Sequence, residues 1–250
     1  MSSFEKPSIE LSYGQSDISI KDEKNVFGSP GMIELKLGFT SIYSTPYSNK
    51  VEKYINRFLF LSNASTDISA DKNSTGLNNR LWRFGMGSKE GYGIKLGSFS
   101  VMPYSSNSIS WSRFDYTVPA FVTATDLSYT ENLKDAFRFG SISEAGINLQ
   151  LTKGVSIQPK YEIADIYPRH LFGKQMLSSL IEYSGLFMID NFTTAVLKNA
   201  PVAGAVVNFI LKNAYEFGFY QLRKDKMNWP FTSEAPLRYN TFKLGMSFTF

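Results

Sequence analysis

The chain offers few side chains for covalent or metal chemistry. It has no cysteine and a single histidine, His170, in the segment Tyr-Pro-Arg-His-Leu-Phe at residues 167–172. The lack of cysteine excludes disulfides, zinc-thiolate sites and cysteine nucleophiles. One histidine cannot by itself supply a transition-metal site. A serine paired with His170 would be a nucleophile, but no Gly-x-Ser-x-Gly motif occurs. We therefore expect no catalytic residue, metal site or cofactor.

Glycines gather on one polar face of residues 81–97. They are Gly85, Gly87, Gly91, Gly93 and Gly97, and Arg83 and Lys95 share their parity. Glycine weakens the interior of a strand, so several on one face indicate curvature, close approach of another backbone, or a ligand. Curvature with tight closure is the favoured interpretation. Contact with a plugging segment and a ligand pocket remain as alternatives.

The elements that carry these residues are predicted to be amphipathic strands. Apolar and polar residues alternate over 9–13, 33–39, 137–151 and 155–163. Residues 51–62 are also predicted to be a strand, with its register open because residues 57–61 are apolar on both faces. Residues 81–97 are predicted as a hairpin turning at 88–91. Residues 98–104 and 107–118 are predicted as a second hairpin around 105–107, with a bulge where the parity shifts after Trp111. The polar segment 63–79 is predicted to be a loop.

The last ten residues alternate without a break, and the chain ends on phenylalanine. This ending resembles the C-terminal signal of bacterial outer-membrane β-barrels. The resemblance implies that the barrel-assembly machinery reads the apolar positions of this strand, which are Phe242, Leu244, Met246, Phe248 and Phe250. It also implies an all-β fold: an antiparallel up-and-down transmembrane barrel of 8–10 strands, similar to the small OmpA/OmpX kind.

The strand count is the open point of this fold prediction. About nine strands are visible in the sequence, whereas closed bacterial barrels have an even number. Either residues 117–128 supply a tenth strand, or the first segment lies outside the barrel and eight remain. Nothing in the chain resembles a linker, so we expect a single domain over 1–250.

In such a barrel, the polar faces of the strands point into the lumen. The inward set mixes both charges: Glu10, Glu34, Lys36, Arg83, Lys95, Arg138, Glu144, Lys160, Glu162 and Lys243. Unpaired buried ions are costly, so a narrow barrel is expected to pair these charges across its interior. The candidate lumen or plug contacts are Arg83, Gly85, Gly87, Gly93, Lys95, Arg138, Glu144, Lys160 and Glu162.

A helical insertion at about 170–225 is predicted before the last strand. Apolar residues recur at helical spacing from Leu171 to Lys198, and Pro201 suits the first turn of a second helix. The two helices are too apolar for water, yet too interrupted by polar residues to cross lipid alone. They need a partner surface, either the lumen or another protein. The side of the membrane on which they lie is left open.

Composition agrees with an envelope location. Aromatic residues make up 15% of the chain, mean hydropathy is −0.17, and 26 basic residues stand against 22 acidic ones. Alternating strands keep the hydropathy of a barrel low. No apolar run is long enough for a conventional transmembrane helix. The scattered basic residues do not indicate nucleic-acid binding. Residues 1–7 contain no export signal, so we expect the mature form of an outer-membrane protein, with Met1 either added or native.

The favoured function is therefore non-enzymatic. We expect a structural or partner-binding role in the cell envelope, with the helical hairpin as a plug or an interaction element. The expected partners are outer-membrane lipid and the assembly machinery, with another envelope protein bound through residues 170–225 as a further candidate. The first alternative is a small porin or uptake channel gated by the helices. A lipid-modifying enzyme centred on His170 is the second.

Overall fold

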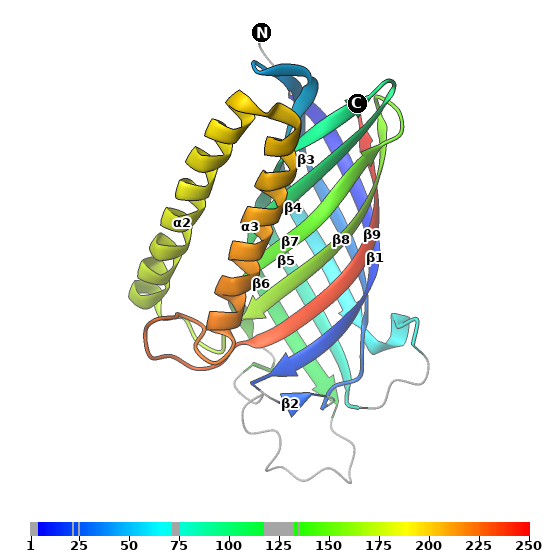
Figure 1. Ribbon diagram of the computed structural model, residues 1–250. Coiled ribbons are helices and arrows are strands. Elements are labelled where there is room, and N and C mark those ends of the chain that lie inside the picture. Colours follow the sequence, from blue (N-terminus) through cyan, green and yellow to red (C-terminus); the bar gives the residue numbers. More distant parts are fainter. Residues whose placement is uncertain (1–4, 22, 25, 72–75, 118–132, 135) are drawn as a thin grey trace.

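The computed structural model describes residues 5–21, 23–24, 26–71, 76–117, 133–134 and 136–250. Long strands form most of it, and two long helices precede the last strand (Figure 1). The strands are β1 (Lys6–Ile20), β2 (Glu23–Lys24), β3 (Gly31–Thr45), β4 (Ser48–Ser65), β5 (Asn78–Leu96), β6 (Phe99–Thr117), β7 (Phe137–Gln150), β8 (Val155–Ile166) and β9 (Leu237–Thr249). The helices are the short η1 (Thr66–Ile68), α2 (Phe172–Asn199) and α3 (Pro201–Arg223).

The sheet closes on itself as an up-and-down barrel. Its order is β2-β1-β3-β4-β5-β6-β7-β8-β9, and β1 also pairs with β9. Because β2 contains only two residues and pairs with the end of β1, the barrel wall consists of eight antiparallel strands. The predicted fold class is confirmed, and so are the two helices between β8 and β9.

The predicted alternation sets which residues face inward. In β9, Phe242 and Leu244 are 61% and 56% exposed on the outer surface, while Lys243 between them is fully buried. In β1 and β3, too, the apolar side chains lie on the outer surface and the charged side chains point inward. A soluble protein would bury the apolar face instead. The outer wall is therefore suited to contact with lipid.

Both predicted hairpins are wrong, because each is a single continuous strand. Strand β5 runs through the expected turn at 88–91, and β6 runs through the expected turn at 105–107. Their pairing keeps one register from Asn78↔Thr117 to Leu96↔Phe99. The two segments are polar on both faces and so resemble turns in sequence. The outward polar residues there face a helix, as described below.

The predicted bulge in β6 is also wrong. The registers of β6 with β5 and with β7 are uniform across Trp111. The apolar residues change parity after Trp111 because Phe114 and Tyr116 point into the barrel. There Phe27 contacts both rings at centroid distances of 5.2 and 5.7 Å. The end of the lumen is apolar at that level, so the inward face of the strand becomes apolar. The possible tenth strand at 117–128 falls almost entirely outside the described residues, and the barrel closes without it.

The two ends of the barrel differ. The start of β1 and the C-terminus lie at one end, together with the short β3–β4, β5–β6 and β7–β8 connections, and we call it the turn end (Figure 1). The longer connections lie at the opposite end, which we call the loop end. The two helices begin and finish at the loop end, and their connection at Ala200 approaches the turn end.

The helices lie outside the barrel, along the wall formed by β4, β5 and β6 (Figure 1). Pro201 occupies the first turn of α3, as predicted. In this structure the hairpin therefore does not enter the lumen, so it does not act there as the plug considered above. Among the described residues, no helix combines the length and hydropathy needed to cross a bilayer.

Candidate functional site

A cluster of buried charges fills the middle of the barrel. We call it the lumen cluster, and it contains five cations and four carboxylates: Lys36, Arg83, Lys89, Lys160 and Lys243 with Glu10, Glu34, Glu144 and Glu162. All nine side chains are at least 94% buried. Every strand of the wall except β4 and β6 contributes at least one of them. The alternation of these strands therefore directs nine buried charged side chains into the lumen, where they contact one another.

Glu34 is the most highly connected member of the lumen cluster. Its carboxylate lies 2.8 Å from Lys243 Nζ and 3.3 Å from Lys36 Nζ. Lys160 Nζ and Arg83 Nη2 both lie 3.4 Å away. Four cations thus surround one buried carboxylate. Removing this carboxylate would leave its four cations with fewer partners, and an uncompensated buried ion costs several kcal/mol.

Arg83 links opposite walls of the barrel. Its Nη1 donates to Glu162 at 2.7 Å, and its Nε donates to Ser62 Oγ at 3.0 Å. The guanidinium also lies 5.5 Å from the centre of the Phe60 ring. Gly85 accommodates that ring, since a Cβ at Gly85 would lie 2.8 Å from Phe60 Cε1. The glycines of β5 therefore make room for interior side chains of neighbouring strands.

Side chains also fill the lumen on both sides of the cluster. Toward the loop end, an apolar core from several strands includes Phe58, Phe60, Phe114 and Tyr239. Toward the turn end, Tyr54, Met102 and Tyr104 pack together. Tyr104 donates to Glu144 at 3.1 Å and so joins this layer to the lumen cluster.

Most of the predicted inward residues meet in the lumen cluster, but two do not. Lys95 lies near the turn end with half of its side chain exposed, 3.8 Å from Glu52. Arg138 lies on β7 toward the loop end and forms none of the ion pairs described above. Sequence reasoning missed Lys89, because that residue fell in a predicted turn. It donates to Gln158 at 2.6 Å and contacts Glu10.

A second polar group lies on the outside of the wall. We call it the polar stripe, and it consists of Lys53, Glu90, Ser105, Asn107, Ser141 and Ser143 on β4 to β7. These residues have the outward parity of Phe84 and Phe139, yet they are not apolar. The strand register makes them neighbours, as in the pairs Glu90↔Ser105 and Asn107↔Ser143. Facing lipid, such a row would be unfavourable.

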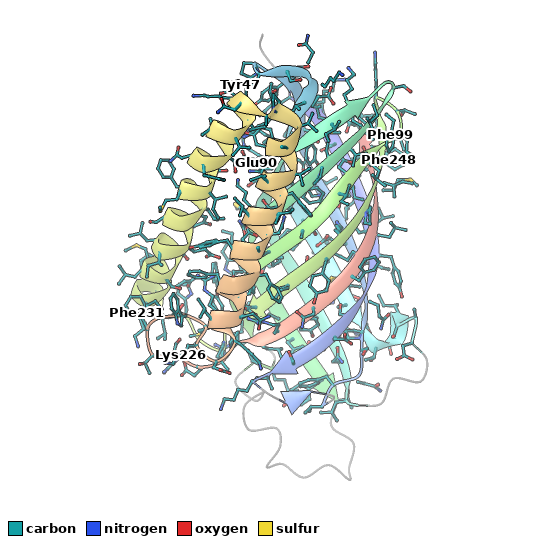
Figure 2. The ribbon with its side chains drawn as sticks, in the orientation of Figure 1. Tyr47, Glu90, Phe99, Lys226, Phe231 and Phe248 are labelled. Carbon is teal, nitrogen blue, oxygen red and sulfur yellow. The ribbon has the colours of Figure 1, made fainter. Side chains whose placement is uncertain are left out.

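Helix α3 covers the polar stripe. Glu216 accepts hydrogen bonds from Asn107 Nδ2 at 2.9 Å and from Ser143 Oγ. Lys212 Nζ lies 3.9 Å from Glu90, whose carboxylate also pairs with Lys53. Figure 2 places Glu90 beside the helices. The interface between α3 and the wall is therefore polar and hydrogen-bonded, with the outward strand residues satisfied by the helix.

The contact between the two helices is polar as well. Arg223 Nη1 lies 2.9 Å from Glu182, and its Nη2 donates to Ser178 Oγ at 3.0 Å. Lys212 pairs with Asp190 of α2 at 2.7 Å. The faces turned away from the barrel are apolar: Phe187 and Met188 of α2 are 68% and 72% exposed. The hairpin is thus polar inside and apolar outside, the distribution of a membrane-embedded element.

No protein-family model matches the chain, and neither does any curated protein. Among solved structures, the chain is similar to Neisserial surface protein A (NspA), with 10% identity over 98% of this chain and 97% of that chain and a TM-score of 0.43. It is similar to Ail, the attachment invasion locus protein of Yersinia pestis, with 10% identity over 99% and 100% of the two chains and a TM-score of 0.37. The chain is also similar to Ail in complex with the heparin analogue sucrose octasulfate, with 10% identity over 98% of this chain and 99% of that chain and a TM-score of 0.39. At these values the likeness concerns the fold alone.

His170 lies outside both polar groups. It is exposed at the loop end and contacts the rings of Phe139 and Phe172 at 5.3 and 6.1 Å. Within the described part of the chain, no hydrogen bond joins its ring to a serine, although Ser179 and His170 line one groove beside the outer wall. His170 therefore packs against aromatic side chains and is not positioned to activate a serine nucleophile.

Proposed function

We propose that this protein is a non-enzymatic, integral outer-membrane β-barrel with a filled lumen, and that its helical hairpin acts as an interaction element in the envelope. The outer wall and the hairpin present many large apolar side chains, while the buried charges lie in the lumen or at the contacts of the two helices. This inverted distribution is the observation that carries the proposal, because it is favourable only in lipid. In this proposal the start of β1, the C-terminus and the short turns face the periplasm, and the base of the hairpin then lies at the cell surface.

The proposed partners follow from the same surfaces. The terminal strand β9, with Phe250 at its end, is the segment that the assembly machinery would read. Lipid surrounds the wall. The outer face of α2, with Phe187 and Met188, is the part of 170–225 that another envelope protein would contact. Helix α2 packs mainly against α3 and lies farther from the wall than α3 does (Figure 1).

The purified protein in a planar bilayer is expected to show no steady single-channel conductance. The lumen cluster and the apolar core at the loop end fill the pore with side chains, and barrels of eight strands are just wide enough for that filling. Insertion is checked independently by compact migration in cold detergent and slower migration after boiling. Regular openings from demonstrably inserted protein would favour the channel alternative over this proposal.

A further inference from the structure

The turn end of the barrel carries a group of exposed lysines. We call it the basic rim, and it consists of Lys6, Lys50, Lys95, Lys153 and Lys198. Lys6 begins β1, Lys50 lies near the start of β4, and Lys95 lies near the end of β5. Lys153 lies in the β7–β8 connection, and Lys198 lies beside the connection between the two helices. Separate segments of the chain thus bring one charge sign to the same end of the barrel (Figure 1).

Little negative charge balances the basic rim. Among the described residues, two acidic side chains lie at the turn end: Glu5 pairs with Arg57 at 2.7 Å, and Glu52 lies 3.8 Å from Lys95. The other four lysines of the rim form no ion pair within the described ranges. Residues 1–4 contain no acidic side chain in their sequence. The charges of these four lysines therefore remain for anions from outside the chain.

The lysines of the rim lie at the edge of the apolar outer wall. Each is within four residues of a large apolar side chain that is at least 38% exposed, and these side chains are Ile9, Tyr47, Leu96, Leu151 and Val202. Figure 2 shows Tyr47 at the turn end. The stem of a lysine lies along apolar surface while its ammonium group reaches the polar surroundings. In the proposed orientation, the ammonium groups therefore reach the headgroups of the periplasmic leaflet.

We propose that the basic rim binds anionic phospholipid headgroups of the membrane leaflet at the turn end. Basic side chains beside a bilayer attract anionic lipids. An acidic polymer would also match the charge of the rim, but the position of the lysines at the edge of the apolar wall favours lipid, whose headgroups lie at that level. This inference rests on the proposed membrane location, and it adds a charge preference to one leaflet around the barrel.

Tryptophan quenching by brominated phospholipids measures which lipid lies beside the rim. Leu96→Trp, in a chain with Trp82→Phe, Trp111→Phe and Trp229→Phe, places a single reporter next to Lys95. The matched control keeps Trp82 alone, which is 47% exposed on the same strand, β5, and lies further toward the loop end. Both complete chains are reconstituted in phosphatidylcholine vesicles with increasing fractions of brominated phosphatidylglycerol, which is anionic, or brominated phosphatidylcholine.

We expect the Leu96→Trp reporter to reach half-maximal quenching at a several-fold lower fraction of brominated phosphatidylglycerol than of brominated phosphatidylcholine. For Trp82, the two lipids should give similar curves. High salt should reduce the preference, because it screens exposed charges. Replacing the five rim lysines by glutamine should abolish the preference, whereas replacing them by arginine should preserve it. Compact migration in cold detergent confirms that each variant is folded, and the salt series tests the proposal without any change to the rim.

The outcomes separate the two proposals. Equal curves for the two lipids at the Leu96→Trp reporter would overturn the lipid-binding rim and leave the membrane location intact. A preference that neither high salt nor the glutamine variant changes would also overturn it. Binding of polyglutamate through the same lysines, without a preference between the lipids, would assign the rim to an acidic polymer instead. If neither reporter is quenched by any brominated lipid, the proposed membrane location itself fails.

Discussion

Glu34→Gln is expected to lower the free energy of unfolding by about 3–5 kcal/mol, the cost of removing one partner from a buried ion group. Four cations lie within 3.4 Å of the Glu34 carboxylate. Without it, five cations of the lumen cluster face three carboxylates in a lumen filled by side chains. Urea unfolding of the protein from lipid vesicles at neutral pH, followed by tryptophan fluorescence, measures the loss.

Lys89→Met is the matched control for this prediction. Lys89 is buried in the same cluster, but its removal leaves four cations facing four carboxylates. Glu10 keeps Lys160 as a partner. We therefore expect a clearly smaller loss than for Glu34→Gln. A loss for Lys89→Met as large as that for Glu34→Gln would show that charge balance does not govern the stability of the lumen.

Replacing residues 172–223 by a short Gly-Ser linker is expected to destabilise the barrel by at least about 2–4 kcal/mol, the cost of one exposed lysine at mid-membrane depth. Lys53 and Glu90 would then face lipid together with Asn107. Conductance is not expected to rise, because the lumen cluster lies within the barrel and owes none of its ion pairs to the hairpin. Vesicle unfolding and planar-bilayer recordings measure the two effects.

A compensating variant makes this test specific. Lys53→Leu, Glu90→Leu and Asn107→Leu together should restore most of the stability lost by the shortened chain, since the stripe would then be apolar. The same three substitutions in the complete chain should be destabilising, because Lys212 and Glu216 would lose partners. If the triple variant has the same effect with and without the hairpin, α3 does not shield the polar stripe.

Much of the fold could be predicted because each barrel strand carries its own period-two signal. The alternation of β9 and β1, and the helical spacing from Leu171 to Lys198, depend only on local sequence. Closure of the barrel by β1 and β9 satisfied the requirement for an even strand number. The lumen charges were identified by parity alone, with Lys89 as the exception.

The errors share one physical cause. The outward residues Glu90, Ser105 and Asn107 are polar because α3 covers them, so β5 and β6 lose their alternation there. Two long strands were therefore interpreted as four short ones. The interruption of the outward face by Ser141 and Ser143 was visible in the sequence, and it marked the helix contact. This interruption is explained by the contact of Ser143 with Glu216 of α3, about 70 residues away along the chain, and a local pattern does not specify such a contact.

Disulfide formation between Val51→Cys and Ala205→Cys tests the docking of the hairpin on the outer wall most directly. The chain has no cysteine of its own, and these two small residues pack together with Leu197. Glu52→Cys paired with Ala205→Cys is the control, because Glu52 is the next residue of β4 and points into the lumen. After oxidation in membranes and non-reducing electrophoresis, we expect the 51–205 pair to cross-link and the 52–205 pair to remain reduced. Cross-linking of 52–205 without 51–205 would place the hairpin inside the barrel and contradict the docking of α3 on the outer wall.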